Sequence, residues 1–368
     1  MLTLVPSDPV SQDLRSAVAA ELDTFLAAKR SLLTAIAPSL AQLGELAAGF
    51  TSGGKRLRPA FCVWGYLAVA EPGPHLGHLL KAAASLDLLH VSALVHDDVM
   101  DASDTRRGQP AAHVQFAAGH AGQRLRGDAA GFGRAGAILL GDLLLVWSQE
   151  LFSTSGFGAD VIARANPVLE AMRTEVTAGQ FLDVLAQARQ AADARTAPAD
   201  VMDEVRRVVE YKTARYTVVR PLQLGASLAG GSAAALEALG AYGSAVGRAF
   251  QLRDDVLGVF GDAEVTGKPA GDDLREGKLT ALLAQALRLS DDAAAGELTR
   301  LVAGGSLGED DIARARQLIT GSGALQAVED EIAVATSDAI AGLEAAPLRD
   351  EAKVALAGLA RAAAERTS

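Results

Sequence analysis

The sequence contains little cysteine, few aromatic residues and no cluster of positive charge. Its single cysteine, Cys62, excludes a disulfide within the chain and fits a reducing compartment such as the cytoplasm. Aromatic residues make up only 4% of the 368 residues, so a core must be built mainly from Ala, Leu and Val. The net charge of −11 and the absence of a basic tract argue against nucleic acid as a partner.

Export and membrane signals are also missing from the sequence. The first residues, MLTLVPSDPVSQDL, do not place a positively charged stretch before an apolar run, so no export signal is expected. The longest apolar run, residues 135–147, is shorter than a membrane span and carries Asp142. A soluble cytoplasmic protein without a transmembrane segment is expected.

Apolar residues at helical spacing dominate the chain, and Ala and Leu are strong helix formers. The only good candidate for a strand is YTVV at 216–219. The spacing predicts helices over residues 14–37, 77–101, 136–154, 159–190, 199–228 and 232–260.

The domain organisation follows from what separates these windows. Residues 1–10 are expected to be flexible, and the Gly- and Arg-rich residues 119–136 are expected to form a loop or an insertion. No repeat and no linker rich in Pro, Gly or Ser divides the chain. We therefore predict one domain over residues 1–368, an all-α bundle of about a dozen helices.

An acidic cluster, LVHDDVMD, ends the helix predicted over 77–101. On a helix, His90, Asp97 and Asp101 lie in one narrow stripe. Two carboxylates four residues apart repel each other. A divalent cation between them removes that repulsion, and oxygen ligands at this spacing suit Mg²⁺, which often completes its shell with water and phosphate.

A second acidic cluster, FQLRDDVLGVFGD, follows about 150 residues later. Its members Gln251, Asp254, Asp255 and Gly258 share one helical face. Two such faces on opposite sides of a bundle would hold a group of Mg²⁺ ions, and the surrounding cations suit a small substrate with several phosphates. These cations are Lys55, Arg58, Arg106, Arg107, Lys212, Lys268 and Lys278.

Six motifs in order resemble those of the trans-polyprenyl diphosphate synthases, most closely the short-chain geranylgeranyl type. The motifs span residues 53–278 and are GGKRLRP, HVSALVHDDVMDASDTRRG, GQFLD, YKT, FQLRDDVLG and TGKPAGDDLREGK. The resemblance implies an all-α bundle around a deep central cavity, usually a homodimer. It also implies head-to-tail (1'-4) condensation of isopentenyl diphosphate with dimethylallyl, geranyl or farnesyl diphosphate, releasing diphosphate and giving mainly geranylgeranyl diphosphate.

The resemblance also implies a role for each matching residue. Three Mg²⁺ per site would be held by Asp97, Asp101 and Asp254, with Asp98, Asp255 and Asp272 in support. The allylic diphosphate would contact Arg106, Lys212 and Lys268, and isopentenyl diphosphate would contact Lys55, Arg58, His90 and Arg107. Thr213 and Gln251 would lie near the carbocation, Gln180 and Asp183 would order metal-bound water and Lys212, and Lys278 would help to close the site.

Two features concern the product and the metals. An aromatic residue four or five positions before the first Asp stops chain growth in short-chain relatives, but Ala93 and Ser92 are small here. With Leu89 on the same helix, they predict room for a product chain of more than fifteen carbons.

The second motif departs from the family pattern because its third Asp is replaced by Gly258, so weaker or differently ordered metal binding is expected on that side.

Other functions remain open at this point. A farnesyl or longer-chain prenyl diphosphate synthase is the nearest alternative to the geranylgeranyl type. The His96–Asp97 pair is also found in helical metal phosphohydrolases, but that function leaves GGKRLRP unexplained. A terpene cyclase needs no second diphosphate pocket, and a non-catalytic synthase subunit would be expected to lose more of its acidic residues.

Overall fold

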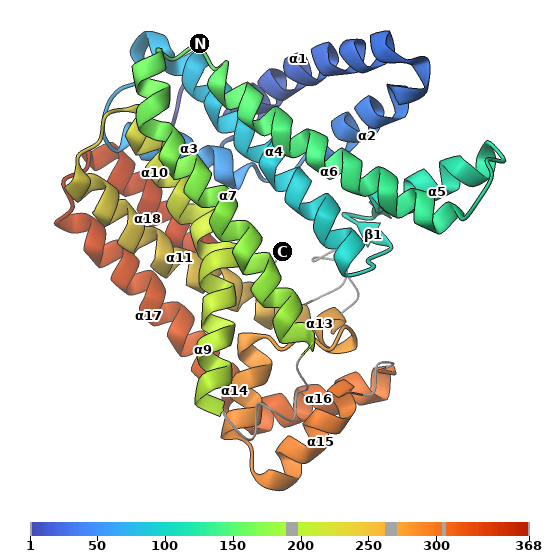
Figure 1. The fold of residues 1–368 in the computed structure, drawn as a ribbon. Helices are drawn as coiled ribbons and strands as arrows, with labels where there is room; N and C mark the ends of the chain where they lie inside the picture. Colours follow the sequence, from blue (N-terminus) through green and yellow to red (C-terminus); the bar gives the residue numbers. More distant parts are fainter. Residues whose placement is uncertain (1, 189–197, 262–270, 304–306, 367–368) are drawn as a thin grey trace.

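The computed structural model describes residues 2–188, 198–261, 271–303 and 307–366, and in these ranges the chain is almost entirely helical (Figure 1). The first half comprises α1 (Gln12–Ile36), η1 (Pro38–Leu40), α2 (Ala41–Thr51), α3 (Leu57–Leu67), η2 (Gly73–His75), α4 (Leu76–Met100), β1 (Thr105–Arg106), β2 (Gln109–Pro110), α5 (Ala112–Gly122), α6 (Ala129–Ser153) and α7 (Ala159–Ala188). The second half comprises α9 (Pro198–Val208), η3 (Val209–Val219), α10 (Arg220–Leu228), α11 (Ala233–Phe260), α13 (Asp272–Arg275), α14 (Ala281–Leu289), α15 (Asp292–Ala303), α16 (Glu309–Gly321), α17 (Ala324–Glu344) and α18 (Asp350–Ala364).

The helices pack around two clusters of buried apolar side chains that share helix α11. Leu239 and Val246 of α11 belong to the larger cluster, with α1, α3, α4, α6 and α10. One to two turns further along, Leu252 and Val256 belong to the second cluster, with α9, α14, α15, α16 and α17. Figure 1 shows α7 and α11 running through the middle of the molecule, with α15 and α16 at one end. Helix α11 therefore joins the two halves of the core.

Two predictions of local structure are wrong. The YTVV segment is not a strand, because it ends the π-helix η3, where all four of its residues are buried among helices. Residues 119–136 are mostly helix and not a loop, since α5 ends at Gly122 and α6 begins at Ala129. The glycines there allow close helix packing. A Cβ on Gly133 would lie closer than 3.0 Å to the carbonyl oxygen of His113.

The N-terminal residues are described from residue 2 onward. Leu2, Leu4 and Val10 pack against the larger core cluster. The indole N–H of Trp64 donates a hydrogen bond of 2.8 Å to the carbonyl oxygen of Pro9. This segment is therefore attached to helix α3, and the expected flexibility of residues 1–10 finds no support from residues 2–10.

A tight hairpin follows helix α4. Strands β1 and β2 pair antiparallel, with Arg106 opposite Gln109. The two residues between them, Arg107 and Gly108, both have positive φ, as a type I′ turn requires. The Arg107 guanidinium reaches back to Gly54 in the turn between α2 and α3. The hairpin thus brings Arg107 beside the GGKRLRP segment and Arg106 beside Asp98 on α4.

A buried ion pair fixes the conformation of that turn. The Arg56 guanidinium lies 2.6 Å from Asp87 Oδ2 on α4 and donates a second bond of 2.7 Å to the carbonyl oxygen of Thr51. Arg56 has positive φ and begins α3, so its side chain holds the turn where the backbone changes direction. The turn exposes Lys55 on one side and starts the helix that carries Arg58 on the other.

Two helices, Gly73–Met100 and Ala129–Ser153, are long and apolar enough to cross a membrane by length and composition. The first is 72% buried within the protein, as expected for a core helix. The second, which is α6, is only 28% buried. Its exposed side chains Phe132, Leu139 and Val146 recur every seven residues, so one apolar face of α6 lies at the surface.

Candidate active site

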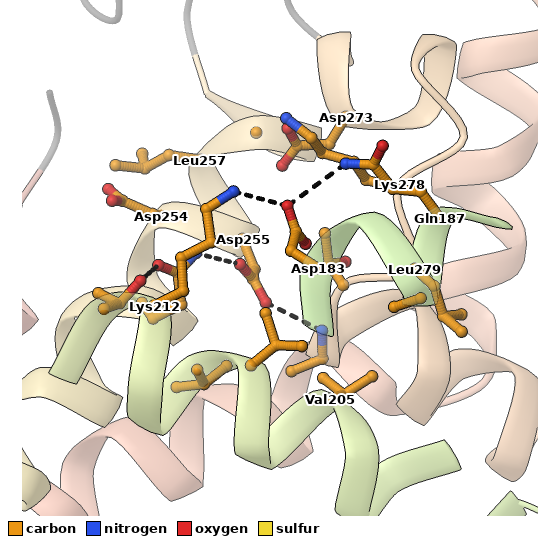
Figure 2. A pocket seen from close by; sticks show the side chains of 18 of the residues that line it. Asp183, Gln187, Val205, Lys212, Asp254, Asp255, Leu257, Asp273, Lys278 and Leu279 are labelled. Atoms are coloured by element: carbon orange, nitrogen blue, oxygen red, sulfur yellow. Dashed lines mark hydrogen bonds and ion pairs between the residues drawn. The ribbon is translucent and has the colours of Figure 1, made fainter. Parts of the chain in front are cut away.

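A cavity of about 360 Å³ opens between the two halves of the core (Figure 2). Its walls come from α7, α9, η3, α11, α13, the start of α14 and Arg366 near the C-terminus. Charged side chains line much of it, and Figure 2 shows Asp183, Lys212 and Asp255 pointing into one hollow. Segments far apart in the sequence therefore place acids and bases together, and the second acidic motif is among them.

The first acidic wall is the C-terminal end of α4. Asp97 Oδ1 accepts a hydrogen bond of 2.8 Å from Gln180 Nε2 and lies 3.3 Å from Lys212 Nζ. Burial alone would raise the pKa of Asp97, but the charges of Lys212 and Arg106 outweigh it and leave that pKa below its usual value. One turn further on, Asp101 Oδ2 lies 3.9 Å from Lys278 Nζ.

The second acidic wall is the C-terminal part of α11. Gln251 Nε2 donates a bond of 2.8 Å to Asp255 Oδ1, and the backbone N–H of Ala281 donates one of 3.0 Å to Asp255 Oδ2. Burial, with the charges of Asp273 and Asp254 added, raises the pKa of Asp255 to about 7. Asp254 lies at the cavity surface, where its Oδ1 is 2.8 Å from an Arg366 nitrogen.

The two aspartates of each Asp–Asp pair have different surroundings. The side chain of Asp98 is 1% exposed and pairs with the Arg106 guanidinium, whose Nε donates a bond of 2.8 Å to Asp98 Oδ1. Asp255 is likewise buried and bonded on both oxygens. Both Asp254 and Asp255 line the cavity, but consecutive helical residues point about 100° apart and therefore meet different neighbours. Asp98 and Asp255 therefore hold neighbouring groups in place, whereas Asp97 and Asp254 each lie beside a cation, Lys212 and Arg366 respectively.

The π-helix η3 positions Lys212 between the acids. Lys212 Nζ lies 2.6 Å from Asp183 Oδ2 as well as near Asp97, and these charges raise its pKa although burial opposes them. Glycines on the neighbouring helices allow η3 to lie close. A Cβ on Gly179 or on Gly247 would come closer than 3.0 Å to its backbone. A π-helical turn at a site of chemistry is a recurrent feature of proteins.

A second basic group lies behind the first wall. Arg58 Nη2 donates a bond of 2.8 Å to Thr217 Oγ1, and its guanidinium stacks on the Tyr216 ring at 4.3 Å. The Tyr216 hydroxyl lies 3.4 Å from His90 Nδ1. Burial and the nearby arginines, Arg58 first, hold the pKa of His90 well below its usual value. His90 is therefore neutral at pH 7 and acts as a hydrogen-bonding group.

Acidification should destabilise the folded protein through His90. The unfolded imidazole titrates near its ordinary value of about 6.5, whereas the folded one titrates well below it. Below pH 6.5 the unfolded state therefore binds a proton that the folded state does not. Stability should fall by up to about 1.4 kcal/mol per pH unit. Urea unfolding at pH 7.5 and 5.5 should show this loss in the wild type and a smaller one in His90→Gln; equal losses would contradict it.

The first wall fits a divalent cation. The side chain of Asp101 is only 9% exposed. Its Oδ1 is buried and has no hydrogen-bond partner in the described part of the chain. Burial and the charge of Asp97 raise the pKa of Asp101. Among the described residues no three acidic, His or Cys side chains converge into a complete metal site. The two carboxylates of Asp97 and Asp101 match Mg²⁺, which takes one or two carboxylates and completes its shell with water and phosphate.

Most of the predicted site residues lie around this cavity or in the basic group behind it, but their roles are not tested by geometry alone. Lys278 lies between the walls. Burial lowers its pKa, but Glu276 foremost, then Asp273 and Asp101, outweigh burial and raise it. Lys268 lies outside the described residues. Asp272 begins α13, and nothing further is described of its side chain. Gln180 contacts Asp97, as noted above.

The residues predicted to set the product length line α4 on its way out of the site. Leu89 and Ser92 are each 3% exposed, and Ser92 Oγ donates a bond of 2.8 Å to the Gly141 carbonyl oxygen on α6. Ala93 is partly buried against the larger core cluster. The described lining of the cavity includes none of the three, so their role stays a prediction.

Several contributors were not predicted from the sequence. Arg366 lies opposite Asp254 and stacks on the Phe250 ring at 4.3 Å, although nothing in its local sequence marks it. Asp273 lines the cavity beside Gly258. Tyr216 and Thr217 support Arg58. For Tyr216 and Thr217 the sequence signal was the nearby motif YKT, and for Asp273 it was the motif TGKPAGDDLREGK.

His96 does not share a metal with Asp97. Its Nε2 lies 3.1 Å from the carbonyl oxygen of Ile138 and 3.5 Å from Asp142 Oδ1, both on α6. The imidazole therefore points away from the acidic wall and holds α4 against α6. This geometry argues against the phosphohydrolase alternative, which needs His96 as a ligand.

A model of the family described as Polyprenyl synthetase matches residues 41–319. The chain belongs to the polyprenyl synthetase family. It is 37% identical over 235 residues to the geranylgeranyl diphosphate synthase of Methanosarcina mazei, an alignment that spans 64% of this chain and 64% of that relative, less than two thirds of either. It is 34% identical over 287 residues to the geranylfarnesyl diphosphate synthase of Aeropyrum pernix, covering 76% of this chain and 79% of that relative.

Solved structures agree with this assignment. The geranylgeranyl pyrophosphate synthase of Corynebacterium glutamicum, complexed with isoprenyl diphosphate and magnesium, superposes with a TM-score of 0.89 at 38% identity, covering 99% of this chain and 100% of that one. The predicted family and the predicted all-α fold are confirmed. Membership of this family agrees with the predicted class of enzyme, a prenyltransferase.

Proposed function

We propose that this polyprenyl synthetase condenses isopentenyl diphosphate head-to-tail (1'-4) with an allylic diphosphate, releases diphosphate and forms mainly geranylgeranyl diphosphate. The observation that carries the proposal is the position of Lys212. Its ammonium lies within 3.3 Å of Asp97 and within 2.6 Å of Asp183, in a cavity that it shares with Asp254. Acids from two walls and a cation between them suit a metal-bound diphosphate.

The residues of the chain supply the remaining charge and dipoles for the reaction. Mg²⁺, three ions in this proposal, would neutralise the allylic diphosphate as it leaves. Lys212 and Arg106 add positive charge at the same end. Thr213 Oγ1 donates a bond of 2.6 Å to Gln251 Oε1, and these oxygens place their dipoles where the positive allylic carbon develops. Apolar helices exclude the water that would trap that carbon as an alcohol.

The second basic group distinguishes a synthase from a terpene cyclase. Lys55, Arg58 and Arg107 surround the turn between α2 and α3 with positive charge, and neutral His90 adds a hydrogen-bonding group. A cyclase handles one diphosphate and has no need of a second pocket. Binding of isopentenyl diphosphate there would hold its double bond within reach of the allylic carbon.

A direct assay tests the proposal. The purified chain alone is incubated with Mg²⁺, isopentenyl diphosphate and a dimethylallyl, geranyl or farnesyl primer, and products are separated by chromatography. Geranylgeranyl diphosphate that disappears with a chelator is the expected result. Turnover without a partner excludes the non-catalytic subunit, and release of a hydrocarbon in place of a longer diphosphate would favour the cyclase.

Replacing Ala93 with phenylalanine should shorten the product to about fifteen carbons. A ring at this position narrows the path along α4, and Ala93 is only partly buried, so the change is tolerated better than at Ser92. Phenylalanine at buried Ser92 would also disturb its contact with α6, at a packing cost of about 1–3 kcal/mol. Chromatography of the products measures the effect. Ala93→Ser should leave the length unchanged, and an unchanged length in Ala93→Phe would refute this account.

The apolar face of α6 supports the proposal of a homodimer. Phe132, Leu139 and Val146 are 44%, 59% and 63% exposed and lie on one side of the helix. A second copy of the chain would cover this face by a symmetric contact. The diphosphate substrates are water-soluble, which agrees with a cytoplasmic enzyme. Sedimentation of the wild type and of Leu139→Glu tests the assembly, with dissociation expected in the variant.

A further inference from the structure

Helix α11 brings Asp254 and Asp255 to the cavity, but hydrogen bonds already engage both oxygens of Asp255. Asp255 is buried, with both of its oxygens accepting hydrogen bonds from Gln251 and from the backbone of Ala281. Gly258, four residues after Asp254, occupies the position that would place a second side chain beside Asp254. The first wall, by contrast, presents both Asp97 and Asp101 at this spacing. The second wall is therefore one carboxylate short on its own helix.

The short helix α13 fills that position. A Cβ added to Gly258 would lie closer than 3.0 Å to both Oδ2 and Cγ of Asp273. The carboxylate of Asp273 thus occupies the space into which a side chain from Gly258 would extend. Both residues line the cavity, and α13 packs against α11. The backbone N–H of Lys278 donates a bond of 3.0 Å to the Asp273 carbonyl oxygen, which fixes the turn that follows α13.

We propose that Asp273 supplies the missing carboxylate of the second wall and, with Asp254, holds the divalent cation on that side, directly or through its water. The loss of a side chain at Gly258 is then what makes room for Asp273. The sequence assigned a supporting role to Asp272, whose side chain lies outside the description, whereas its neighbour Asp273 lines the cavity. The inference rests on the proposed function only for the identity of the metal and its diphosphate.

Metal binding without turnover tests this inference. Mn²⁺ binding is measured by titration calorimetry in the presence of methylenediphosphonate, which cannot react, for the wild type and for Asp273→Asn. The variant should bind Mn²⁺ about 10- to 100-fold more weakly. The charge-matched control Glu297→Gln, whose carboxylate pairs with Arg314 on α16, should bind as the wild type does. Unchanged binding in Asp273→Asn, or a loss in Asp272→Asn alone, would overturn the proposal.

A charge swap provides a second test. Asp273→Gly should lose affinity, and the double variant Gly258→Asp, Asp273→Gly should recover most of it because the carboxylate returns from α11. Thermal unfolding without metal establishes that each variant is folded. A folded double variant as weak as Asp273→Gly would contradict the inference; if the double variant does not fold, Asp273→Asn decides. If Asp273→Asn binds the metal more weakly but the wild type shows no prenyl transfer, the proposed function is refuted and the inference about Asp273 stands.

Discussion

Replacing Asp97 with asparagine should lower kcat/KM for prenyl transfer on the order of 10³-fold. The amide has the size of the carboxylate but lacks its charge, so the first wall would lose the acid that faces Lys212 and Gln180. A Lewis-acid contribution of several kcal/mol to the departure of a diphosphate corresponds to about three powers of ten in rate.

The variant should also require more metal. Rates measured across a range of Mg²⁺ concentrations should show a higher half-saturating concentration in Asp97→Asn than in the wild type. Asp330→Asn on α17 is a suitable control, because this exposed carboxylate accepts a hydrogen bond from Gln326 of its own helix. Activity within tenfold of the wild type at ordinary Mg²⁺ concentrations would show that Asp97 is not a principal ligand.

Replacing Arg56 with methionine should lower the free energy of unfolding by about 3–5 kcal/mol, because it leaves the Asp87 carboxylate buried without its partner. Both side chains are only 7% exposed. Burial raises the pKa of Asp87 even though Arg56 opposes this, and removing Arg56 raises it further. The unfolded carboxyl keeps its ordinary pKa, so the penalty is largest near neutral pH and shrinks as acid protonates Asp87 in the folded state.

The double variant Arg56→Met, Asp87→Leu separates charge from packing. An apolar pair of similar size leaves no buried charge and should recover most of the lost stability. Denaturant unfolding at pH 8 and pH 5.5 measures all three proteins. If the double variant were as unstable as Arg56→Met at both pH values, packing of the arginine stem and its bond to Thr51 would be the cause.

Long helices were predictable because their apolar spacing continues over many turns. The window 77–101 became α4 at Leu76–Met100, and the window 159–190 became α7 at Ala159–Ala188. The failures came from short signals. The β-branched residues of YTVV are typical of strands, but burial among helices on several sides overrides that preference. The glycine-rich residues 119–136 indicated a loop, because sequence alone does not distinguish a flexible glycine from a glycine at a helix contact.

The candidate site was predictable wherever its residues share a helix. Asp97 and Asp101 follow directly from helical geometry, as do Gln251 and Asp254. Contacts across the cavity, such as Lys212 with Asp183, came only from the resemblance to a known family. The choice between Asp272 and Asp273 depends on how α13 is oriented against α11, and a four-residue helix has no periodicity that would reveal this.

Arg366 has a practical consequence for handling the protein. Its guanidinium lies 2.8 Å from Asp254 Oδ1, so the last described turn of the chain reaches the mouth of the cavity. An affinity tag fused directly after Ser368 would be separated from Arg366 by only two residues. A polyhistidine tail at that end would bring extra imidazole ligands beside the acidic walls and distort any metal titration. Purification tags therefore belong at the N-terminus, where Pro9 is attached to Trp64 on α3.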